Sequence, residues 1–195
     1  MKEVIFAHIQ QNSVKGICFI QWTLCLSVKI RKLNLTQVLI NKSMDLNEAF
    51  DEIYNYTHMW NWGPDWEVLR RVYLAFPNSY SVLTPFAYSY LEELIRSTTS
   101  EYGRELFNTD GTLKNYRKVG TKLIDLAIEE NKVSKPEYVK ILTEIKIYFS
   151  QSQPTDIGDN RNSVAHGFMH PRYWDQESFE KLIFDIAKIS KYAGF

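Results

Sequence analysis

The strongest constraint on the fold is a change of hydrophobic period at Ser43. From there to the C-terminus, apolar residues recur every three or four positions, which is the spacing of an amphipathic helix. The first such segment opens with Asp45 and Glu48, which fit a variant of the capping box. Its apolar face comprises Leu46, Ala49, Phe50, Ile53, Thr57 and Trp60. Residues 43–195 are therefore predicted to form one all-α domain, a helical bundle.

The other predicted helices are bounded by capping residues and by helix breakers. Two stretches that contain proline, 61–64 and 77–79, break the chain. The predicted N-terminal caps after the first helix are Asp65, Thr112, Ser134 and Asp175. Pro85 is placed in the first turn of its helix, where its missing N–H costs little. These signals predict helices over residues 46–60, 66–76, 81–101, 113–131, 135–149, 161–166 and 176–193.

Residues 1–42 have a different period. From Trp22 to Arg31, apolar and polar residues alternate, as they do in a strand with one buried face. Residues 3–10 are its predicted partner, with Gly16 in the turn, so this segment is predicted to be a β-hairpin-like N-terminal extension. An alternative interpretation is that the native protein starts at Met44, which directly precedes the first capped helix.

Composition excludes several classes of protein. The 195 residues carry 23 Lys plus Arg and 23 Asp plus Glu, a net charge of zero, whereas proteins that coat nucleic acid non-specifically are usually basic. The two cysteines, Cys18 and Cys25, give neither metal-ligand spacing nor a disulfide framework, which favours a reducing cytoplasm. The most apolar run, 17–28, is too short to cross a bilayer as a helix, so no membrane partner is expected.

One short stretch brings together side chains that catalysis needs. Arg161, Asn162 and His166 lie within six residues of a predicted helix. Asn162 and His166 are four positions apart and share a face, so the amide can hydrogen-bond one ring nitrogen. Arg161 lies about 100° around the helix from Asn162, and its guanidinium can hold a phosphate. A base, an orienting amide and a fixed cation suit metal-free cleavage of RNA, in which His166 would take the 2′-hydroxyl proton.

Other interpretations of the same residues compete with catalysis. An arginine and a histidine on a helix are often only a surface charge and a half-buried imidazole. His166 and His170 have the spacing of two metal ligands, but Gly167 and Pro171 are expected to break the helix and no third ligand is near, so no metal is expected. Ser163 lacks the strand–turn–helix elbow of a hydrolase nucleophile. No glycine-rich phosphate loop occurs in the sequence, so no cofactor is expected.

The stretch resembles the motif of the HEPN family: Arg, a polar residue, three further residues and His. Here it reads Arg161-Asn162-Ser163-Val164-Ala165-His166, followed by Gly167. HEPN proteins are helical bundles, and many are metal-independent ribonucleases of toxin–antitoxin, abortive-infection and CRISPR systems. The resemblance covers six residues, within an all-helical pattern. It implies an up-and-down four-helix core with added helices, and a homodimer in which the motifs of two copies meet in one cleft.

Two further groups of charged residues are candidates for the site. The resemblance implies acidic support from an early helix, for which Glu92 and Glu93 are the candidates, while a solvated face with local ion pairs is the alternative. Four basic residues recur at spacings of three and four in the predicted helix 113–131. These candidates for contact with RNA phosphates are Lys114, Arg117, Lys118 and Lys122. An ordinary solvated face is again the alternative.

The sequence thus predicts a cytoplasmic, metal-independent endoribonuclease of defence or toxin–antitoxin biology. It would bind RNA, act as a homodimer and respond to an antitoxin or another protein regulator. The alternative is a non-catalytic HEPN-like module that binds nucleotide, RNA or a protein partner, which the neutral net charge favours. The observation that distinguishes them is whether Asn162 and His166 share an open cleft or are packed away from solvent.

Overall fold

A computed structural model of the chain describes residues 44–195, except for 104–106 and 113–116. The predicted β-hairpin-like extension over residues 1–42 lies outside the described residues. Residues Met44–Phe195 form one compact unit. Its α-helices are α2 (Leu46–Tyr56), α3 (Gly63–Ala75), α4 (Tyr80–Ser97), α5 (Thr121–Asn131), α6 (Pro136–Ile145), α7 (Arg161–His166) and α8 (Gln176–Ser190). Three short 3-10 helices join them: η1 (Pro77–Ser79), η2 (Lys146–Phe149) and η3 (Pro171–Tyr173).

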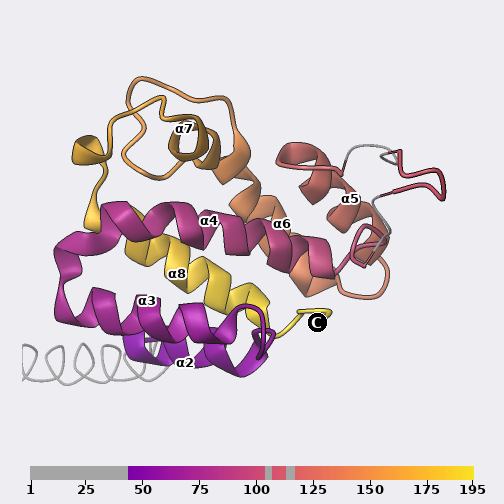
Figure 1. Ribbon diagram of the computed structural model, residues 1–195, viewed down its shortest axis with the longest axis horizontal. Helices are drawn as coiled ribbons and strands as arrows, with labels where there is room; N and C mark the ends of the chain where they lie inside the picture. The colour runs from indigo at the N-terminus through magenta and orange to yellow at the C-terminus, as the bar shows by residue number, and fades with distance from the viewer. Residues whose placement is uncertain (1–43, 104–106, 113–116) are drawn as a thin grey trace, which may run out of the picture. The chain divides into compact units, whose positions relative to one another are not determined.

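The bundle is built around α4 and α8, which pack against each other (Figure 1). Helices α2 and α3 form a hairpin, in which α2 packs on α8 and α3 on α4. Helices α5 and α6 form a second hairpin that joins the bundle through α4 and α8, and α7 packs on α4. In Figure 1, α7 lies on the opposite side of α4 from α2 and α3. The prediction of an all-α helical bundle is confirmed.

The interior is apolar and rich in aromatic rings, and it holds the bundle together. The largest fully buried side chains include Tyr73, Tyr90, Tyr138, Tyr148 and Phe179. Full burial of one such ring stabilises a fold by about 1.5–3 kcal/mol, so this core outweighs any single polar contact. One predicted inward residue is wrong, because Trp60 follows the end of α2 and is 83% exposed.

The first and last helices begin where the sequence predicts. The Asp45 carboxylate accepts from the Glu48 N–H at 2.8 Å, and the Glu48 carboxylate accepts from the Asp45 N–H at 3.0 Å. At the start of α8, the Asp175 carboxylate accepts from the Ser178 N–H at 2.7 Å. Each cap satisfies backbone donors that have no partner within the helix and contributes about 1 kcal/mol.

In the first half of the bundle, the predicted start of α3 and the predicted end of α4 are wrong. Helix α3 begins at Gly63, before the predicted cap Asp65, because Pro64 fits the first turn, where an N–H has no intrahelical partner. Helix α4 begins at Tyr80 and ends at Ser97, so it does not extend to residue 101 and Pro85 lies beyond its first turn.

Two predicted caps in the second half are also wrong. Thr112 does not cap α5, because its N–H and hydroxyl donate to the Asp110 carboxylate at 2.9 and 2.6 Å and so close a turn. Helix α5 begins only at Thr121, after Gly120, whose φ of 56° lies in the left-handed region. The capping box of Ser134 and Glu137 is not formed, since α6 begins at Pro136 without a side-chain cap.

Within the described part of the chain, none of the helices combines the length and the apolar character that crossing a membrane requires.

Candidate functional site

Helix α7, which carries the Arg–His motif, is anchored at both ends. At its start, the Asn160 side chain accepts from the Ser163 N–H at 3.0 Å and donates to the Ser150 hydroxyl at 3.0 Å. At its end, Gly167 has φ 63°, and the Phe168 N–H donates to the Ser163 carbonyl at 3.0 Å. A helix of six residues is not stable alone, so these anchors decide where the motif lies.

The Arg161 side chain turns toward α4. Its Nη2 lies 2.6 Å from Oε2 of Glu92, and the two side chains are 20% and 11% exposed. The pair is partly shielded from water, so its attraction is stronger than that of a surface pair. The resemblance implied an acidic residue from an early helix near the motif, and Glu92 on α4 lies there.

The same carboxylate also holds the start of α5. Oε1 of Glu92 accepts from the Gly120 N–H at 2.7 Å, while Oε2 binds Arg161. Gly120 has φ 56° and ψ −136°, a conformation that essentially only glycine adopts without strain. Glu92 therefore joins three parts of the bundle that are far apart in the sequence: α4, α7 and the start of α5.

Glu93 has a different environment. Its Oε2 lies 3.2 Å from Nε of Arg96, and no contact with Arg161 is formed among the described residues. The Arg96 side chain is 6% exposed and also donates to the Lys118 carbonyl at 2.8 Å. Of the two acidic candidates, only Glu92 contacts the motif, because Glu93 follows it by about 100° around α4.

Asn162 does not make the hydrogen bond predicted for it. Its amide donates to the carbonyls of Phe149 and Ser150 at 3.2 and 3.0 Å, and within the described residues none of its hydrogen bonds reaches His166. These two carbonyls lie at the end of η2, where they need donors from outside the helix. The Asn162 amide thus fixes α7 on η2, and its oxygen accepts from Nη1 of Arg161 at 3.5 Å.

His166, the last residue of α7, is exposed to solvent. The interpretation of a satisfied core histidine therefore does not fit its position. Asn162 is half-buried, so the two residues are not packed away together in the core. An exposed imidazole on a helix end that Gly167 closes is accessible to a large substrate such as RNA.

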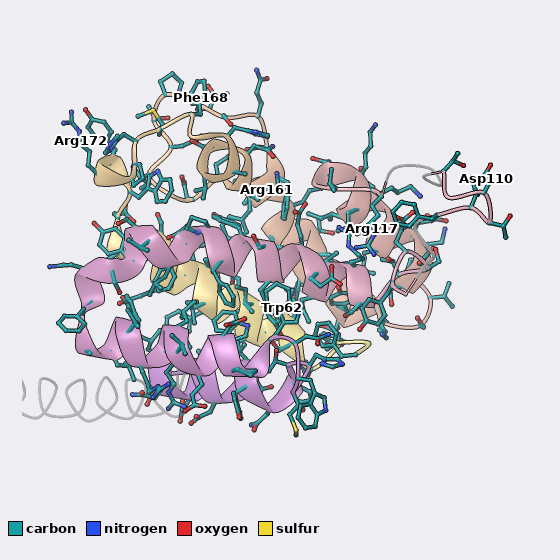
Figure 2. All side chains as sticks on the ribbon, viewed as in Figure 1. Trp62, Asp110, Arg117, Arg161, Phe168 and Arg172 are labelled. Carbon is teal, nitrogen blue, oxygen red and sulfur yellow. The ribbon has the colours of Figure 1, made fainter. Side chains whose placement is uncertain are left out.

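The basic candidates do not form the predicted helical stripe. Arg117 and Lys118 are exposed but precede α5. Of the candidates, only Lys122 lies on that helix, where it is exposed in the first turn. Lys114 lies outside the described residues. The backbone of Lys118 is fixed on both sides, because its N–H donates to Glu101 at 3.3 Å and its carbonyl accepts from Arg96. In the view of Figure 2, Arg117 and Arg161 lie on the same side of α4.

Sequence patterns missed several residues that position the site. Asn160 precedes the predicted helix and is a preferred capping residue, so local rules could have identified it. Gly120 and Arg96 carried no local signal, because their roles depend on partners 28 and 22 residues away. Ser163 is fully buried, and its hydroxyl has no partner among the described residues, which fits neither a nucleophile nor a proton relay.

Among the residues that the structure describes, no three His, Cys, Asp or Glu side chains gather as a metal ion would require. The His166–His170 pair therefore lacks a third ligand there. No protein-family model, curated protein or solved structure matches this chain. The candidate site is thus defined by its own geometry: an exposed imidazole at one end of α7, and a guanidinium at the other end that Glu92 binds.

Proposed function

We propose that the chain is a metal-independent endoribonuclease of the HEPN type. The observation that carries the proposal is that α7 exposes His166 at one end, while Glu92 holds the Arg161 guanidinium at 2.6 Å at the other. An imidazole open to solvent can take a proton from a ribose hydroxyl and return one near neutral pH. A positioned guanidinium can stabilise the charge that grows on a phosphate during its attack.

The proposed reaction needs no group beyond these side chains. His166 removes the proton of a 2′-hydroxyl, whose oxygen attacks the adjacent phosphorus. The bond from phosphorus to the 5′-oxygen breaks, the leaving oxygen takes up the proton that His166 had received, and a 2′,3′-cyclic phosphate and a 5′-hydroxyl result. Of the five N–H groups of Arg161, one donates to Glu92 and one to Asn162. The remaining three have no partner among the described residues and can donate to the phosphate oxygens.

The geometry of α7 favours a site that two copies complete. Residues five positions apart on a helix differ in direction by about 140°, so Arg161 and His166 leave α7 on different sides. A homodimer with α7 at its two-fold axis would bring the imidazole of one copy to the guanidinium of the other. The protein would act in the cytoplasm, in defence or toxin–antitoxin biology, under an antitoxin or another protein regulator.

RNA contact would be local, because the chain has no net positive charge. Arg117, Lys118 and Lys122 are the described candidates for this patch, with Lys114 as the fourth. Replacement of any one of them by alanine should reduce the number of counterions released on RNA binding by about one, measured as the slope of log K against log salt concentration. This change distinguishes these residues from those that act on the chemistry.

The test is incubation of the purified protein with mixed RNA in the presence of EDTA. The proposal expects cleavage to products with cyclic or 3′-phosphate ends, no cleavage of DNA, and a loss of about 10²–10⁴-fold in His166→Ala. Arg161→Ala should lose a comparable factor, and Arg161→Lys should recover only part of it, since Lys lacks the planar fork. Cleavage that requires a divalent ion, or wild-type cleavage by both alanine variants, would contradict the proposal.

A second candidate is a HEPN-like module that binds nucleotide, RNA or a protein partner without cutting. The observation that favours it is the Glu92–Arg161 ion pair, which neutralises the cation of the motif. For this candidate, fluorescence anisotropy should show RNA binding that Arg161→Ala weakens and His166→Ala leaves unchanged, with no cleavage at any protein concentration.

A further inference from the structure

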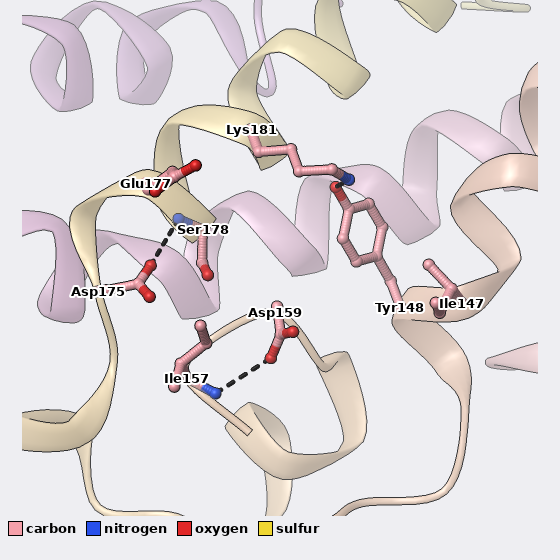
Figure 3. A pocket seen from close by; sticks show the side chains of 8 residues that line it. All are labelled: Ile147, Tyr148, Ile157, Asp159, Asp175, Glu177, Ser178 and Lys181. Atoms are coloured by element: carbon pink, nitrogen blue, oxygen red, sulfur yellow. Dashed lines mark hydrogen bonds between the residues drawn. The ribbon is translucent and has the colours of Figure 1, made fainter. Parts of the chain in front are cut away.

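A pocket of about 350 Å³ lies beside the motif, between η2, the loop after it and the first turns of α8 (Figure 3). Ile147 and Ile157 give it apolar walls, and Tyr148 gives it the edge of a buried ring. Neither Arg161 nor His166 lines it. The proposed ribonuclease reaction therefore makes no use of this pocket.

The charge that lines the pocket is mainly negative. Asp159, Asp175 and Glu177 contribute carboxylates, against one ammonium from Lys181. That ammonium is already engaged, because Nζ of Lys181 lies 2.6 Å from the Tyr148 hydroxyl and 3.1 Å from the Asp185 carboxylate. Among the described residues, none of the three carboxylates of the pocket forms a salt bridge with a cation.

Among the described residues, two of these carboxylates accept a hydrogen bond on only one oxygen. Oδ1 of Asp159 accepts from the Ile157 N–H at 3.1 Å, and Oδ1 of Asp175 accepts from the Ser178 N–H at 2.7 Å. The second oxygen of each has no partner among the described residues. These backbone bonds fix both carboxylates in place, so their free oxygens are positioned acceptors.

The hydroxyl of Ser178 faces the same space. Ser178 is 8% exposed, and its Oγ has no hydrogen-bond partner within the described part of the chain. Figure 3 shows its side chain directed from α8 toward the pocket. This hydroxyl is therefore available to donate to, or accept from, a polar group of a ligand in the pocket.

We propose that this pocket binds an alkylguanidinium or alkylammonium group, the chemistry shared by basic side chains and polyamines. Its N–H groups would donate to Asp159, Asp175 and the Ser178 hydroxyl, and its methylene groups would cover Ile147 and Ile157. An anion does not fit, because Asp175 and Glu177 already occupy the positive end of α8. A metal ion does not fit either, since these carboxylates do not form a metal-binding group.

The test is a titration of the full chain with butylguanidinium, followed by amide NMR signals, with butylurea as the neutral control of the same shape. The expected result is saturable shifts of the Ile157 and Ser178 signals with butylguanidinium and none with butylurea. Asp159→Asn keeps the acceptor for the Ile157 N–H, and Ser178→Ala removes a hydroxyl that has no partner among the described residues, so both should fold. Each should weaken binding at least tenfold, which corresponds to about 1.4 kcal/mol.

A matched pair of variants controls for net charge. Glu177 and Glu137 are both exposed and both occupy the second position of a helix, but only Glu177 lines the pocket. Glu177→Gln should weaken binding, while Glu137→Gln should not. Equal binding by these two variants, or equal shifts with butylurea, would overturn the proposal.

Two further ligands distinguish the sources of the cation. Agmatine represents a free polyamine, and acetyl-Ala-Arg-Ala-amide represents an arginine of a protein partner. Binding of the peptide at least as tightly as agmatine supports a protein side chain, and binding of agmatine alone supports a small amine. If neither shifts the signals of the pocket, the site does not exist. These titrations do not measure RNA cleavage. Their result therefore tests the cation site independently of the proposed ribonuclease activity.

Discussion

At the scale of single residues, the Glu92 carboxylate connects two parts of the candidate site. One oxygen binds the Arg161 guanidinium and the other binds the Gly120 N–H, at 2.6 and 2.7 Å. Glu92 is therefore proposed to be a positioning residue, which acts on the substrate through Arg161. Glu93, its neighbour in the chain, contacts Arg96 and provides a matched control.

Glu92→Gln should reduce RNA cleavage about tenfold or more, an increase of about 1.4 kcal/mol in the barrier, because Arg161 loses its fixed orientation. Glu93→Gln should change the rate of RNA cleavage by less than half of the factor expected for Glu92→Gln. The measurement is kcat and KM for both variants with the same RNA, beside thermal melts. A purely structural role for Glu92 would lower the melting temperature and leave kcat of the folded fraction unchanged.

The hydroxyl of Ser163, in the centre of the motif, is predicted to destabilise the folded protein. Its hydroxyl is buried without a partner among the described residues, so Ser163→Ala should raise the free energy of unfolding by about 1 kcal/mol. Urea denaturation of the two proteins at one pH measures this difference. A decrease of similar size would show that the hydroxyl is satisfied in the folded protein.

At the scale of elements, Gly120 links the start of α5 to the site. Gly120→Ala should destabilise the protein by about 1–3 kcal/mol, because φ 56° with ψ −136° is strained for any other residue. It should also reduce cleavage, since the N–H that donates to Glu92 is displaced. Gly111, with φ 81°, is the control: Gly111→Ala introduces strain in an exposed turn that is not joined to Glu92. Equal effects of the two variants on cleavage would exclude this link.

The contact between η2 and α8 gives the protein a sensitivity to acid. Burial by itself would raise the pKa of the Asp185 carboxyl, but hydrogen bonds from Lys188, Tyr148 and Lys181 outweigh it and hold the pKa below its ordinary value. Because the folded pKa is lowered, the stabilisation by Asp185 is complete above the pKa of an unfolded aspartate, about 3.9. This stabilisation is lost as the pH falls further, through the pKa that Asp185 has in the folded protein.

Asp185→Asn should therefore lower the free energy of unfolding by about 1.5–3 kcal/mol at pH 7, the scale of hydrogen bonds to a charged group. This difference from wild type should shrink as the pH falls below about 4. Urea denaturation at pH 7 and pH 3 measures both values. Asp125→Asn removes an exposed ion pair with Lys146 and should cost less than about 0.5 kcal/mol at either pH. A difference for Asp185→Asn that is constant with pH would contradict the assigned role.

At the scale of the whole molecule, the described part of residues 44–195 contains one hydrophobic core cluster. The buried apolar side chains of α2, α3, α4 and α8 pack on one another, and the capping box of Asp45 and Glu48 closes the start of α2. A protein that begins at Met44 should therefore keep its helical circular dichroism and melt cooperatively. Loss of both signals would show that the preceding residues are an integral part of the fold.

The sequence by itself determined the features that depend on neighbouring residues. The helical period from Ser43, the caps Asp45 and Asp175, and the closure of α7 by Gly167 follow from local hydrogen bonds and backbone preferences, and the structure has them. The Arg–His motif was recognised in the same way, since its residues lie within one short helix. Such features need no knowledge of which segments meet.

The tertiary structure alone decided which partners these residues have. Glu92 rather than Glu93 reaches Arg161, 69 residues away, because the packing of α7 on α4 selects one face of α4. Asn162 binds the end of η2 instead of His166, because carbonyls without partners lie there once the chain has folded back. Helix α5 starts at Thr121 because Glu92 and a left-handed Gly120 fix the chain before it. These outcomes depend on contacts between distant segments, which a local pattern does not encode.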